Sequence, residues 1–276
     1  MAQVPAISLH DGVEIPQLGF GVFQVPPAET QRVVETALGA GYRHIDTAAA
    51  YRNEAGVGAA IAQSGIPREE IFLTTKLWNS QQGYDSTLRA FESSRERLGL
   101  DRVDLYLIHW PLPSRGLYLE TWRAFERIRE EGGTRSIGVS NFRIEELEEL
   151  QRRAELQPTV NQIELHPRFQ QAELRAWHAA HGIATEAWSP LGQGTLLGDQ
   201  TIAEVAAHHV RTPAQVVIRW HLQLGNVVIP KSATPERIRE NFAVLDFVLE
   251  EDEMEALGRL DGGGRIGPDP GTFAVA

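Results

Sequence analysis

The chain of 276 residues contains no cysteine, which excludes disulfide bonds, thiolate metal sites and a cysteine nucleophile. It also contains no apolar run near the roughly 20 residues that a membrane span needs, and its first residues, MAQVPAISLHDG, show no signal-peptide pattern. The net charge of −11 argues against a broad cationic surface for nucleic acid or anionic membranes. We therefore expect a cytoplasmic protein without nucleic-acid or membrane partners.

Lysine is nearly absent, because 24 of the 26 basic residues are arginines and only Lys76 and Lys231 are lysines. A genome bias toward arginine accounts for the general pattern. An ammonium group differs from a guanidinium in being compact and in being able to lose its proton or change the acidity of a neighbour. The two remaining lysines therefore suggest positions where the chemistry needs an ammonium.

Short apolar runs alternate with amphipathic segments along nearly the whole chain. Eight runs are typical of buried strands, being short, often β-branched and bounded by turn residues: GFGVF, RHIDT, IFLTTKL, VDLYLIH, TRSIGVS, TVNQIEL, ATEAWSP and NVVIPKS. Amphipathic segments typical of helices lie between them: ETQRVVETALGAG, STLRAFESSRERLGL, LETWRAFERIREEGG, RIEELEELQRRAEL, AELRAWHAAHG and TPAQVVIRWHLQLG. The alternation implies parallel strands joined by crossovers. No linker or low-complexity tract interrupts the pattern, so residues 1–276 are expected to form a single domain.

The spacing of polar residues favours closure of these strands into a barrel. Asp46, Lys76, His109 and Asn141 stand at successive strand ends, 30, 33 and 32 residues apart. Each interval matches one βα unit, and eight units match a (β/α)8 TIM barrel, in which such residues converge on one mouth. The segments TIAEVAAHHV and LEEDEMEALGRL exceed the repeat and predict two extra helices.

The segment AISLHDGVEIPQLG precedes the first strand and predicts a β-hairpin. Its apolar residues alternate around Asp11 and Gly12, a pair typical of a type I′ turn. We expect the hairpin to cover the end of the barrel opposite the mouth as a plug.

Four residues at the predicted mouth form a proton-donating unit. Tyr51 lies five residues beyond Asp46, and a tyrosine with an ordinary pKa of about 10 is a poor acid, but an adjacent ammonium lowers that pKa. Lys76 would supply the ammonium, and Asp46 would keep it charged. His109 could donate a hydrogen bond to a substrate oxygen. The set predicts protonation of an oxygen on which negative charge develops, as reduction of a carbonyl to an alcohol requires.

Three of these residues also have a purely structural interpretation. Asp46 could cap a helix, Lys76 could form a salt bridge, and His109 could be a satisfied buried histidine. We expect His44 to point to the opposite face of its strand from Asp46 and to be structural. Four further histidines are expected at the surface or in helix packing: His178, His181, His208 and His209.

Several stretches together resemble the aldo-keto reductases, and within them the bacterial 2,5-diketo-D-gluconate reductases. They are DGVEIPQLGFGVF, GYRHIDTAAAYRNE, TTKLWN, DLYLIHWP, RSIGVSNF, NQIELHP, WSPLGQG and IPKSATPERIRENF, and they cover most of the chain. The resemblance implies a catalytic tetrad of Asp46, Tyr51, Lys76 and His109, with Tyr51 as the general acid.

Hydride transfer needs a donor that side chains do not provide, so a nicotinamide cofactor is expected. The segment PKSATPERIREN follows the last strand, where phosphate sites of this fold occur beside a helix N-terminus. It offers cationic groups and hydroxyls together, and Pro235 suits the first turn of a helix. The glycine-rich stretch from Gly262 to Gly267 matches a dinucleotide fingerprint, but it follows a helix and opens none, so we treat it as a chance match.

The resemblance implies NADP(H) as the cofactor. It places Lys231, Ser232, Thr234 and Arg237 around the adenosine phosphate, Glu240 and Asn241 near adenine, Ser140, Asn141 and Gln162 on the carboxamide, Trp188 against the nicotinamide, and Ser189 and Leu191 in the same site. Diketogluconate reductases can carry arginine at the position of Thr234, so NADH use stays open. An apolar pocket for a compact carbonyl compound is expected between Phe23, Trp78 and Trp110.

These features predict NADPH-dependent reduction of an aldehyde or ketone, with a keto-sugar acid such as 2,5-diketo-D-gluconate as one candidate. The short loop PLPSRGLY and the short tail after Asp261 predict an open pocket, and the resemblance implies a monomer without a metal. One alternative is a metal-dependent hydrolase, because His44, Asp46, Lys76, His109 and His166 superficially resemble ligands at strand ends. The other is a non-catalytic NADP(H)-binding subunit.

Overall fold

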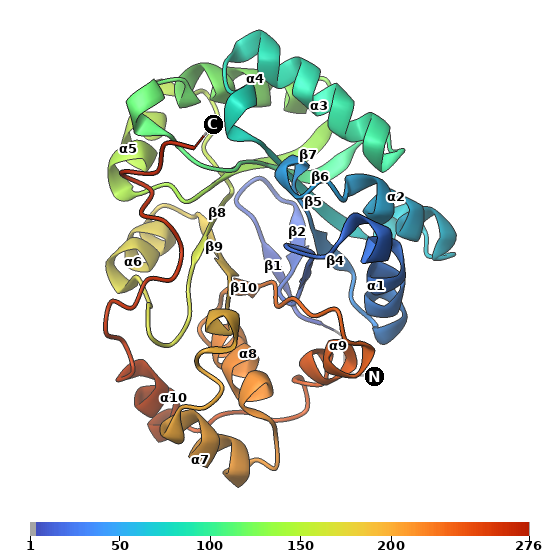
Figure 1. Ribbon diagram of the computed structural model, residues 1–276. Coiled ribbons are helices and arrows are strands. Elements are labelled where there is room, and N and C mark those ends of the chain that lie inside the picture. The colour runs from blue at the N-terminus through green and yellow to red at the C-terminus, as the bar shows by residue number, and fades with distance from the viewer. Residues whose placement is uncertain (1–3, 276) are drawn as a thin grey trace.

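A computed structural model describes residues 4–275, and its central feature is an eight-stranded parallel sheet with the strands in chain order (Figure 1). The strands are β3 Phe20–Gly21, β4 His44–Asp46, β5 Phe72–Leu77, β6 Val103–Ile108, β7 Thr134–Ser140, β8 Val160–Glu164, β9 Ala184–Trp188 and β10 Val227–Val228. The first and last strands meet, since Gly19 N donates to Val228 O at 2.9 Å and Gly21 N donates to Pro230 O at 3.2 Å. This closure confirms the (β/α)8 barrel.

Helices surround the barrel, and two more extend the repeat (Figure 1). The outer ring consists of α1 Pro27–Ala40, α2 Glu54–Gln63, α3 Tyr84–Leu98, α4 Tyr118–Glu130, α5 Ile144–Arg153, α6 Ala172–Ala180, α8 Pro213–Gln223 and α9 Pro235–Phe242. The extra helices are α7 Gln200–His208 and α10 Glu251–Gly258, as predicted. Short 3-10 turns occur at η1 Ala49–Tyr51, η2 Arg68–Glu70, η3 Asn79–Gln81, η4 Pro113–Arg115 and η5 Gly192–Gly194.

Helix α2 is the one outer helix that no predicted segment covered. Its sequence, EAGVGAAIAQ, is rich in small residues and carries little amphipathic pattern. The small residues allow close packing, because a Cβ atom at Gly58 would collide with the backbone carbonyl of Leu98 at the end of α3. The helical conformation of this segment is therefore stabilised by packing against α1 and α3 and not by an amphipathic pattern in its own sequence.

The N-terminal hairpin consists of β1 Ala6–Ser8 and β2 Glu14–Pro16, and it covers the N-terminal ends of the barrel strands. Leu9 and Ile15 pack there against a small cluster that includes Leu105 and Val160. The plug is confirmed, but the type I′ turn is wrong. That turn needs positive φ at both central residues, whereas the connection is a wider loop in which only Gly12 has positive φ, at 85°.

The large core lies between the barrel and the helical ring, and it is built from side chains of almost every element. Trp122, Phe125 and Tyr106 form a stacked series within it, with ring centroids 5.9 and 4.4 Å apart. Among the described residues, no helix is long and apolar enough to cross a membrane.

Candidate active site

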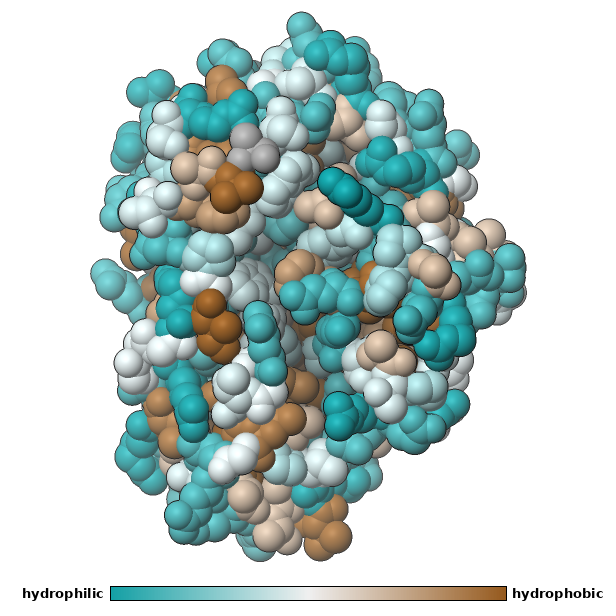
Figure 2. Space-filling view, in the orientation of Figure 1, coloured by the Kyte–Doolittle hydropathy of each residue, from teal (hydrophilic) through white to brown (hydrophobic). Residues whose placement is uncertain are grey.

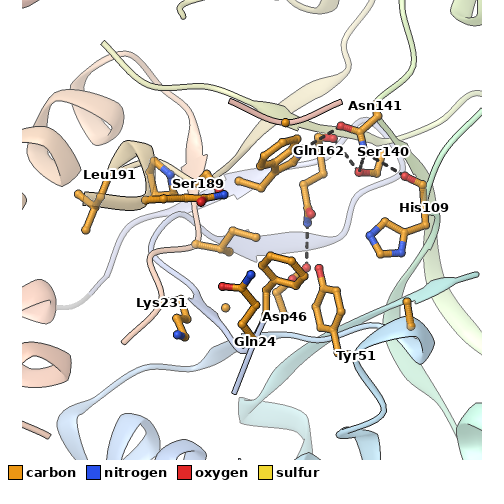
Figure 3. A pocket seen from close by; sticks show the side chains of 18 of the residues that line it. Gln24, Asp46, Tyr51, His109, Ser140, Asn141, Gln162, Ser189, Leu191 and Lys231 are labelled. Carbon is orange, nitrogen blue, oxygen red and sulfur yellow. Dashed lines mark hydrogen bonds between the residues drawn. The ribbon is translucent and has the colours of Figure 1, made fainter. Parts of the chain in front are cut away.

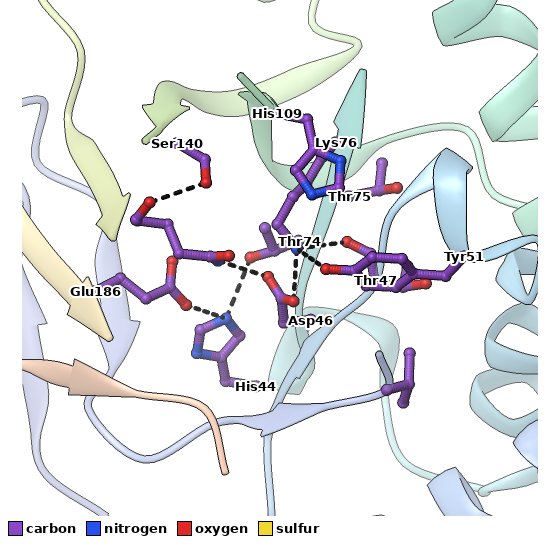
Figure 4. Close-up of polar contacts among 12 residues, drawn as sticks. His44, Asp46, Thr47, Tyr51, Thr74, Thr75, Lys76, His109, Ser140 and Glu186 are labelled. Atoms are coloured by element: carbon purple, nitrogen blue, oxygen red, sulfur yellow. Dashed lines mark hydrogen bonds and ion pairs between the residues drawn. The ribbon is translucent and has the colours of Figure 1, made fainter. Parts of the chain in front are cut away.

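The structure brings the four tetrad residues together at the carboxyl end of the barrel (Figure 4). Asp46 ends β4, Lys76 lies near the end of β5, His109 follows β6, and Tyr51 ends η1. The Nζ atom of Lys76 donates to Asp46 Oδ1 at 2.6 Å and to Tyr51 Oη at 3.4 Å. A third bond, to the backbone oxygen of Thr47 at 2.9 Å, completes its three donors. Lys76 therefore joins the carboxylate and the phenol directly.

Lys76 is fully buried and keeps its charge. Burial alone would lower the pKa of Lys76, but the ion pair with Asp46 and the neighbouring Tyr51 more than offset burial, so its pKa lies above the ordinary value. The expected role of Asp46 as the counter-charge agrees with this direction.

The acidity expected for Tyr51 is corrected by the structure. Burial raises the pKa of Tyr51 by more than Lys76 lowers it, and Asp46 raises it further, so its pKa lies above the ordinary value of 10.0. The sequence shows the cation but not the loss of solvent around the phenol. Tyr51 is accordingly a fully protonated phenol at neutral pH, and Lys76 acts by stabilising negative charge that develops there.

His109 stands over the phenol in a neutral form. Its ring makes edge contacts with Tyr51 and Trp78, with centroids 5.7 and 5.3 Å apart. Burial and the charge of Lys76 hold the pKa of His109 well below its usual value. Its Nδ1 atom is buried without a hydrogen-bond partner. A neutral imidazole in this place can donate one hydrogen bond from a ring nitrogen.

A chain of amide and hydroxyl groups continues from the tetrad along β7, β8 and β9 (Figure 3). Gln162 Nε2 donates to Asp46 Oδ2 at 2.8 Å, and Ser140 Oγ donates to the backbone oxygen of Gln162 at 2.8 Å. Asn141 Nδ2 donates to His109 O at 3.0 Å, and Asn141 Oδ1 accepts from Trp188 Nε1 at 2.8 Å. These bonds fix the three polar side chains and the indole in one wall.

His44 does not face away from Asp46, and that expectation is wrong. Residues two apart in a strand point to the same face, so both side chains point into the barrel. His44 is fully buried below Asp46, where Nε2 lies 3.1 Å from Thr74 Oγ1 (Figure 4).

The residues suggested for a metal-dependent hydrolase do not form a ligand set. Among residues 4–275, the one group of three metal-ligand side chains within reach of one another is His208, His209 and Glu253, contributed by α7, the residue after it, and α10. His166 instead lies beside Glu164, with Nε2 3.1 Å from Oε1.

A cavity of about 1250 Å³ opens above the tetrad, where Figure 2 shows a hollow in this face of the molecule. The predicted cofactor and substrate residues line it, except Thr234 and the buried Lys76: Phe23, Asp46, Tyr51, Trp78, His109, Trp110, Ser140, Asn141, Gln162, Trp188, Ser189, Leu191, Lys231, Ser232, Arg237, Glu240 and Asn241. Residues predicted from eight separate segments therefore meet in one space.

The far end of the cavity adjoins the start of α9. Pro235 is its first residue, and Thr234 precedes it without forming a side-chain cap bond. Lys231 and Arg237 line the cavity beside this helix end. Glu240 is oriented by Thr212, whose Oγ1 donates to its Oε1 at 2.7 Å. Cationic side chains and helix N–H groups thus gather where an anion would be stabilised.

The C-terminal tail, although short, forms a further wall of the cavity, with Gly267, Pro268 and Phe273 among the lining residues. Glu164 anchors the tail by accepting from Ile266 N at 2.6 Å and Gly267 N at 2.8 Å. Beyond this anchor, Phe273 packs on Trp110 with ring centroids 4.4 Å apart. The glycine-rich stretch lies in this tail and opens no helix, as expected of a chance match.

Several cavity residues were missed by sequence reasoning. Gln24 and Arg52 line the cavity with positive φ, 58° in each case, which favours glycine or asparagine. Arg52 directly follows Tyr51 in the sequence, a proximity that could have identified it, whereas Gln24 offers no local signal. Phe273 could have been found only by knowing that the tail returns to the mouth.

Comparisons with known proteins agree with this geometry. The model of the Aldo/keto reductase family matches residues 17–261. An aldo-keto reductase of Mycobacterium sp. (strain KMS) is 59% identical over 269 residues, covering 98% of each chain. Methylglyoxal reductase DkgA of Yersinia pestis is 52% identical over 275 residues, covering 99% of each. A crystal structure of a Gox0644 variant in complex with NADPH superposes with a TM-score of 0.95 at 52% identity, covering 99% of each chain. The chain belongs to the aldo/keto reductase family.

Proposed function

We propose that this protein catalyses the NADPH-dependent reduction of an aldehyde or ketone to the alcohol. The observation that carries the proposal is the buried Lys76 ammonium, which contacts both Asp46 at 2.6 Å and the Tyr51 hydroxyl at 3.4 Å on the floor of the cavity. A protonated phenol beside a fixed cation is suited to give its proton to an oxygen that gains negative charge.

Each tetrad residue has a defined part in the proton transfer. Tyr51 donates the proton from its hydroxyl to the carbonyl oxygen of the substrate. Lys76 then stabilises the phenolate, while Asp46 keeps Lys76 charged and in place. His109 is neutral and directs a substrate oxygen by a hydrogen bond from its ring. The low pKa of His109 keeps it in this form at neutral pH.

The cavity fits a nicotinamide cofactor at both ends. The fit at the inner end rests on the bonded wall of Ser140, Asn141, Gln162 and Trp188, which offers amide and hydroxyl groups to a carboxamide. At the outer end, Lys231, Ser232 and Arg237 would hold the adenosine phosphate, with Glu240 and Asn241 near adenine. Bound NADPH would supply the hydride. Thr234 does not line the cavity, so NADH use stays open as an alternative.

The substrate is proposed to be a compact carbonyl compound. An aromatic wall beside the tetrad supports this proposal, because it suits a compact, partly apolar compound; it consists of Phe23, Trp78, Trp110 and the tail residue Phe273. The relative from Yersinia pestis bears the name methylglyoxal reductase, which supports a small 2-oxo compound. A keto-sugar acid such as 2,5-diketo-D-gluconate is a larger candidate. A single-domain, cytoplasmic monomer is part of the proposal, and sedimentation velocity tests the monomer.

The replacement Tyr51→Phe tests the proposal, because it removes one hydroxyl and preserves the ring. We expect kcat/KM for carbonyl reduction to fall by about 10²–10⁴-fold, the usual contribution of a general acid. The dissociation constant of NADPH, measured by fluorescence, should change by less than about twofold, since Tyr51 is not assigned to cofactor binding. Unchanged turnover in this variant would contradict the mechanism. Binding of NADPH without turnover of any carbonyl in a broad panel would favour the non-catalytic subunit.

A further inference from the structure

A second polar layer lies inside the barrel beneath the tetrad. Two of its members stand two residues before tetrad members on the same strands, His44 before Asp46 on β4 and Thr74 before Lys76 on β5. The third is Glu186 on β9, which is fully buried (Figure 4). A glutamate in the centre of a barrel needs a compensating partner or a proton.

No donor stands at hydrogen-bond distance and angle from the carboxyl group of Glu186, although the amide of Gln162 lies nearby. Both of its oxygens are buried without a partner, and the nearest ion-pair partner is His44 Nε2, 3.6 Å from Oε1. Two bare carboxylate oxygens in such a place would be strongly unfavourable. Gln162 Nε2, another neighbour, donates to Asp46 instead.

The hydrogen bonds of His44 determine which of its nitrogens carries a proton. Nδ1 lies 3.3 Å from the backbone oxygen of Pro16, which can only accept, so the proton of neutral His44 is on Nδ1. Nε2 then carries a lone pair and accepts from the hydroxyl of Thr74 at 3.1 Å. The ring has little room to turn, because even a Cβ atom at Gly19 would lie 2.6 Å from Nδ1. Neutral His44 therefore has no N–H to offer Glu186, and an ionised Glu186 would leave both carboxylate oxygens without a donor.

We propose that Glu186 is a protonated carboxylic acid at neutral pH beside a neutral His44, and that this neutral pair is a positioning element for the tetrad above it. The role of the pair in catalysis rests on the proposed function, whereas the protonation state does not.

The charges around the pair support this assignment. Burial and the negative charge of Asp46 raise the pKa of Glu186 to about 8, although Gln162 and Lys76 oppose the shift. Burial lowers the pKa of His44 to about 4, against the charges of Asp46 and, from β6, Asp104. The proton therefore resides on Glu186.

The proton controls the charge balance below Tyr51. With Glu186 neutral, Asp46 and Lys76 compensate each other and the ammonium favours a developing phenolate. An ionised Glu186 would add one uncompensated negative charge, which raises the pKa of Tyr51 and makes it a weaker acid. Carbonyl reduction should therefore slow as pH rises through the pKa of Glu186.

Infrared spectroscopy of the wild-type protein tests the protonation state without any turnover. Among the described residues, Glu186 is the one carboxyl group whose pKa lies above its usual range. Although the chain has 37 acidic residues, a single carboxylic acid band is therefore expected at pH 7. The band should disappear with a midpoint of about 8. Absence of the band at pH 7 would overturn the proposal, including the case in which His44 is charged and Glu186 ionised.

Single-turnover reduction from pH 6 to 9.5 tests the consequence for Tyr51. A slower reaction with NADPH deuterated at the transferred position shows that hydride transfer is being followed. In the wild type the rate should fall by roughly three- to tenfold across the midpoint, whereas Glu186→Gln should show no such fall.

Thr185→Val is the matched control, because Thr185 lies next along β9 but bonds His178 outside the barrel, and it should follow the wild type. An equal fall in Glu186→Gln would overturn the positioning role. If Glu186→Gln does not fold, the infrared test on the wild type still decides the protonation state.

Discussion

The two ends of the barrel are built in contrasting ways. At the mouth, five residues other than glycine line the cavity with positive φ: Gln24, Arg52, Asn141, Ser189 and Gln193. Such conformations are unfavourable for most side chains and persist where the surrounding structure enforces them. At the base, the hairpin needs positive φ only at Gly12, where it is free of strain.

The hydrogen bonding of polar groups also differs between the two ends: the groups named here are paired at the base, whereas one is unpaired at the mouth. At the base, Asp11 accepts from Ser136 Oγ at 2.8 Å and from Arg129 at 3.2 Å. Gln17 Nε2 donates to Leu222 O at 2.8 Å, which joins the segment after the hairpin to α8. At the mouth, His109 Nδ1 has no partner. The base therefore contributes stability, and the mouth retains unsatisfied and strained groups that a ligand can engage.

The largest effect is expected for Lys76→Met, which should damage activity and stability together. Removing the ammonium leaves Asp46 buried without its ion-pair partner, so the free energy of unfolding should fall by about 3–5 kcal/mol. Carbonyl reduction should fall by about 10²–10⁴-fold, because the phenolate of Tyr51 loses its cation. Chemical denaturation and steady-state kinetics measure the two quantities.

A double variant separates the two losses. Adding Asp46→Asn to Lys76→Met should recover much of the stability and none of the activity, because the unpaired charge is gone but the cation is still absent. Recovery of activity in the double variant would be incompatible with the assigned role of Lys76.

A smaller effect, confined to stability, is expected for Asp11→Ala at the base. The substitution leaves the hydroxyl of Ser136 and the guanidinium of Arg129 without their shared acceptor and should lower the free energy of unfolding by about 1–3 kcal/mol. The value of kcat should stay within about twofold of the wild type. Asp11→Asn, which retains one acceptor oxygen, serves as the control. A loss of activity as large as that of Lys76→Met would remove the distinction between the two ends.

The smallest effect is expected for His208→Gln. His208 is the last residue of α7 and lies at neither end of the barrel. The hydrogen bond from His208 to Glu253, at 2.7 Å, raises the pKa of His208 above its usual 6.5. A histidine whose pKa is raised by folding stabilises the protein below its unfolded pKa, and this contribution disappears as pH rises through the folded pKa. The Tm deficit of the variant should therefore be larger at pH 6 than at pH 9. An equal deficit at both values would indicate lost packing rather than lost charge.

The barrel could be predicted because its signals are repeated along the chain. Each buried strand is a short apolar run, and the intervals from Asp46 through Asn141 repeat one βα unit. The parallel pairing then places the strand ends together, so the meeting of Lys76 and Asp46 follows from topology. Helix α2 could not be predicted in this way, because its small residues allow contacts with other helices and do not form an amphipathic pattern along the chain.

Apart from the face assigned to His44, the errors share a physical cause, which is that each property depends on surroundings in three dimensions. The acidity of Tyr51 depends on how much solvent the closed barrel removes, which opposes the visible charge of Lys76. His44 was assigned to the wrong face of its strand, although the period of two already places it beside Asp46. The turn at Asp11 and the path of the tail depend on contacts with distant residues, such as Ser136 and Glu164.

The position of the tail has a consequence for engineering the protein. Phe273 packs on Trp110, and the backbone oxygen of Val275 accepts from Asn79 Nδ2 at 2.7 Å, so the tail is held against the mouth by few contacts. Substitutions in the tail can therefore reshape one side of the binding surface while leaving every barrel strand unchanged.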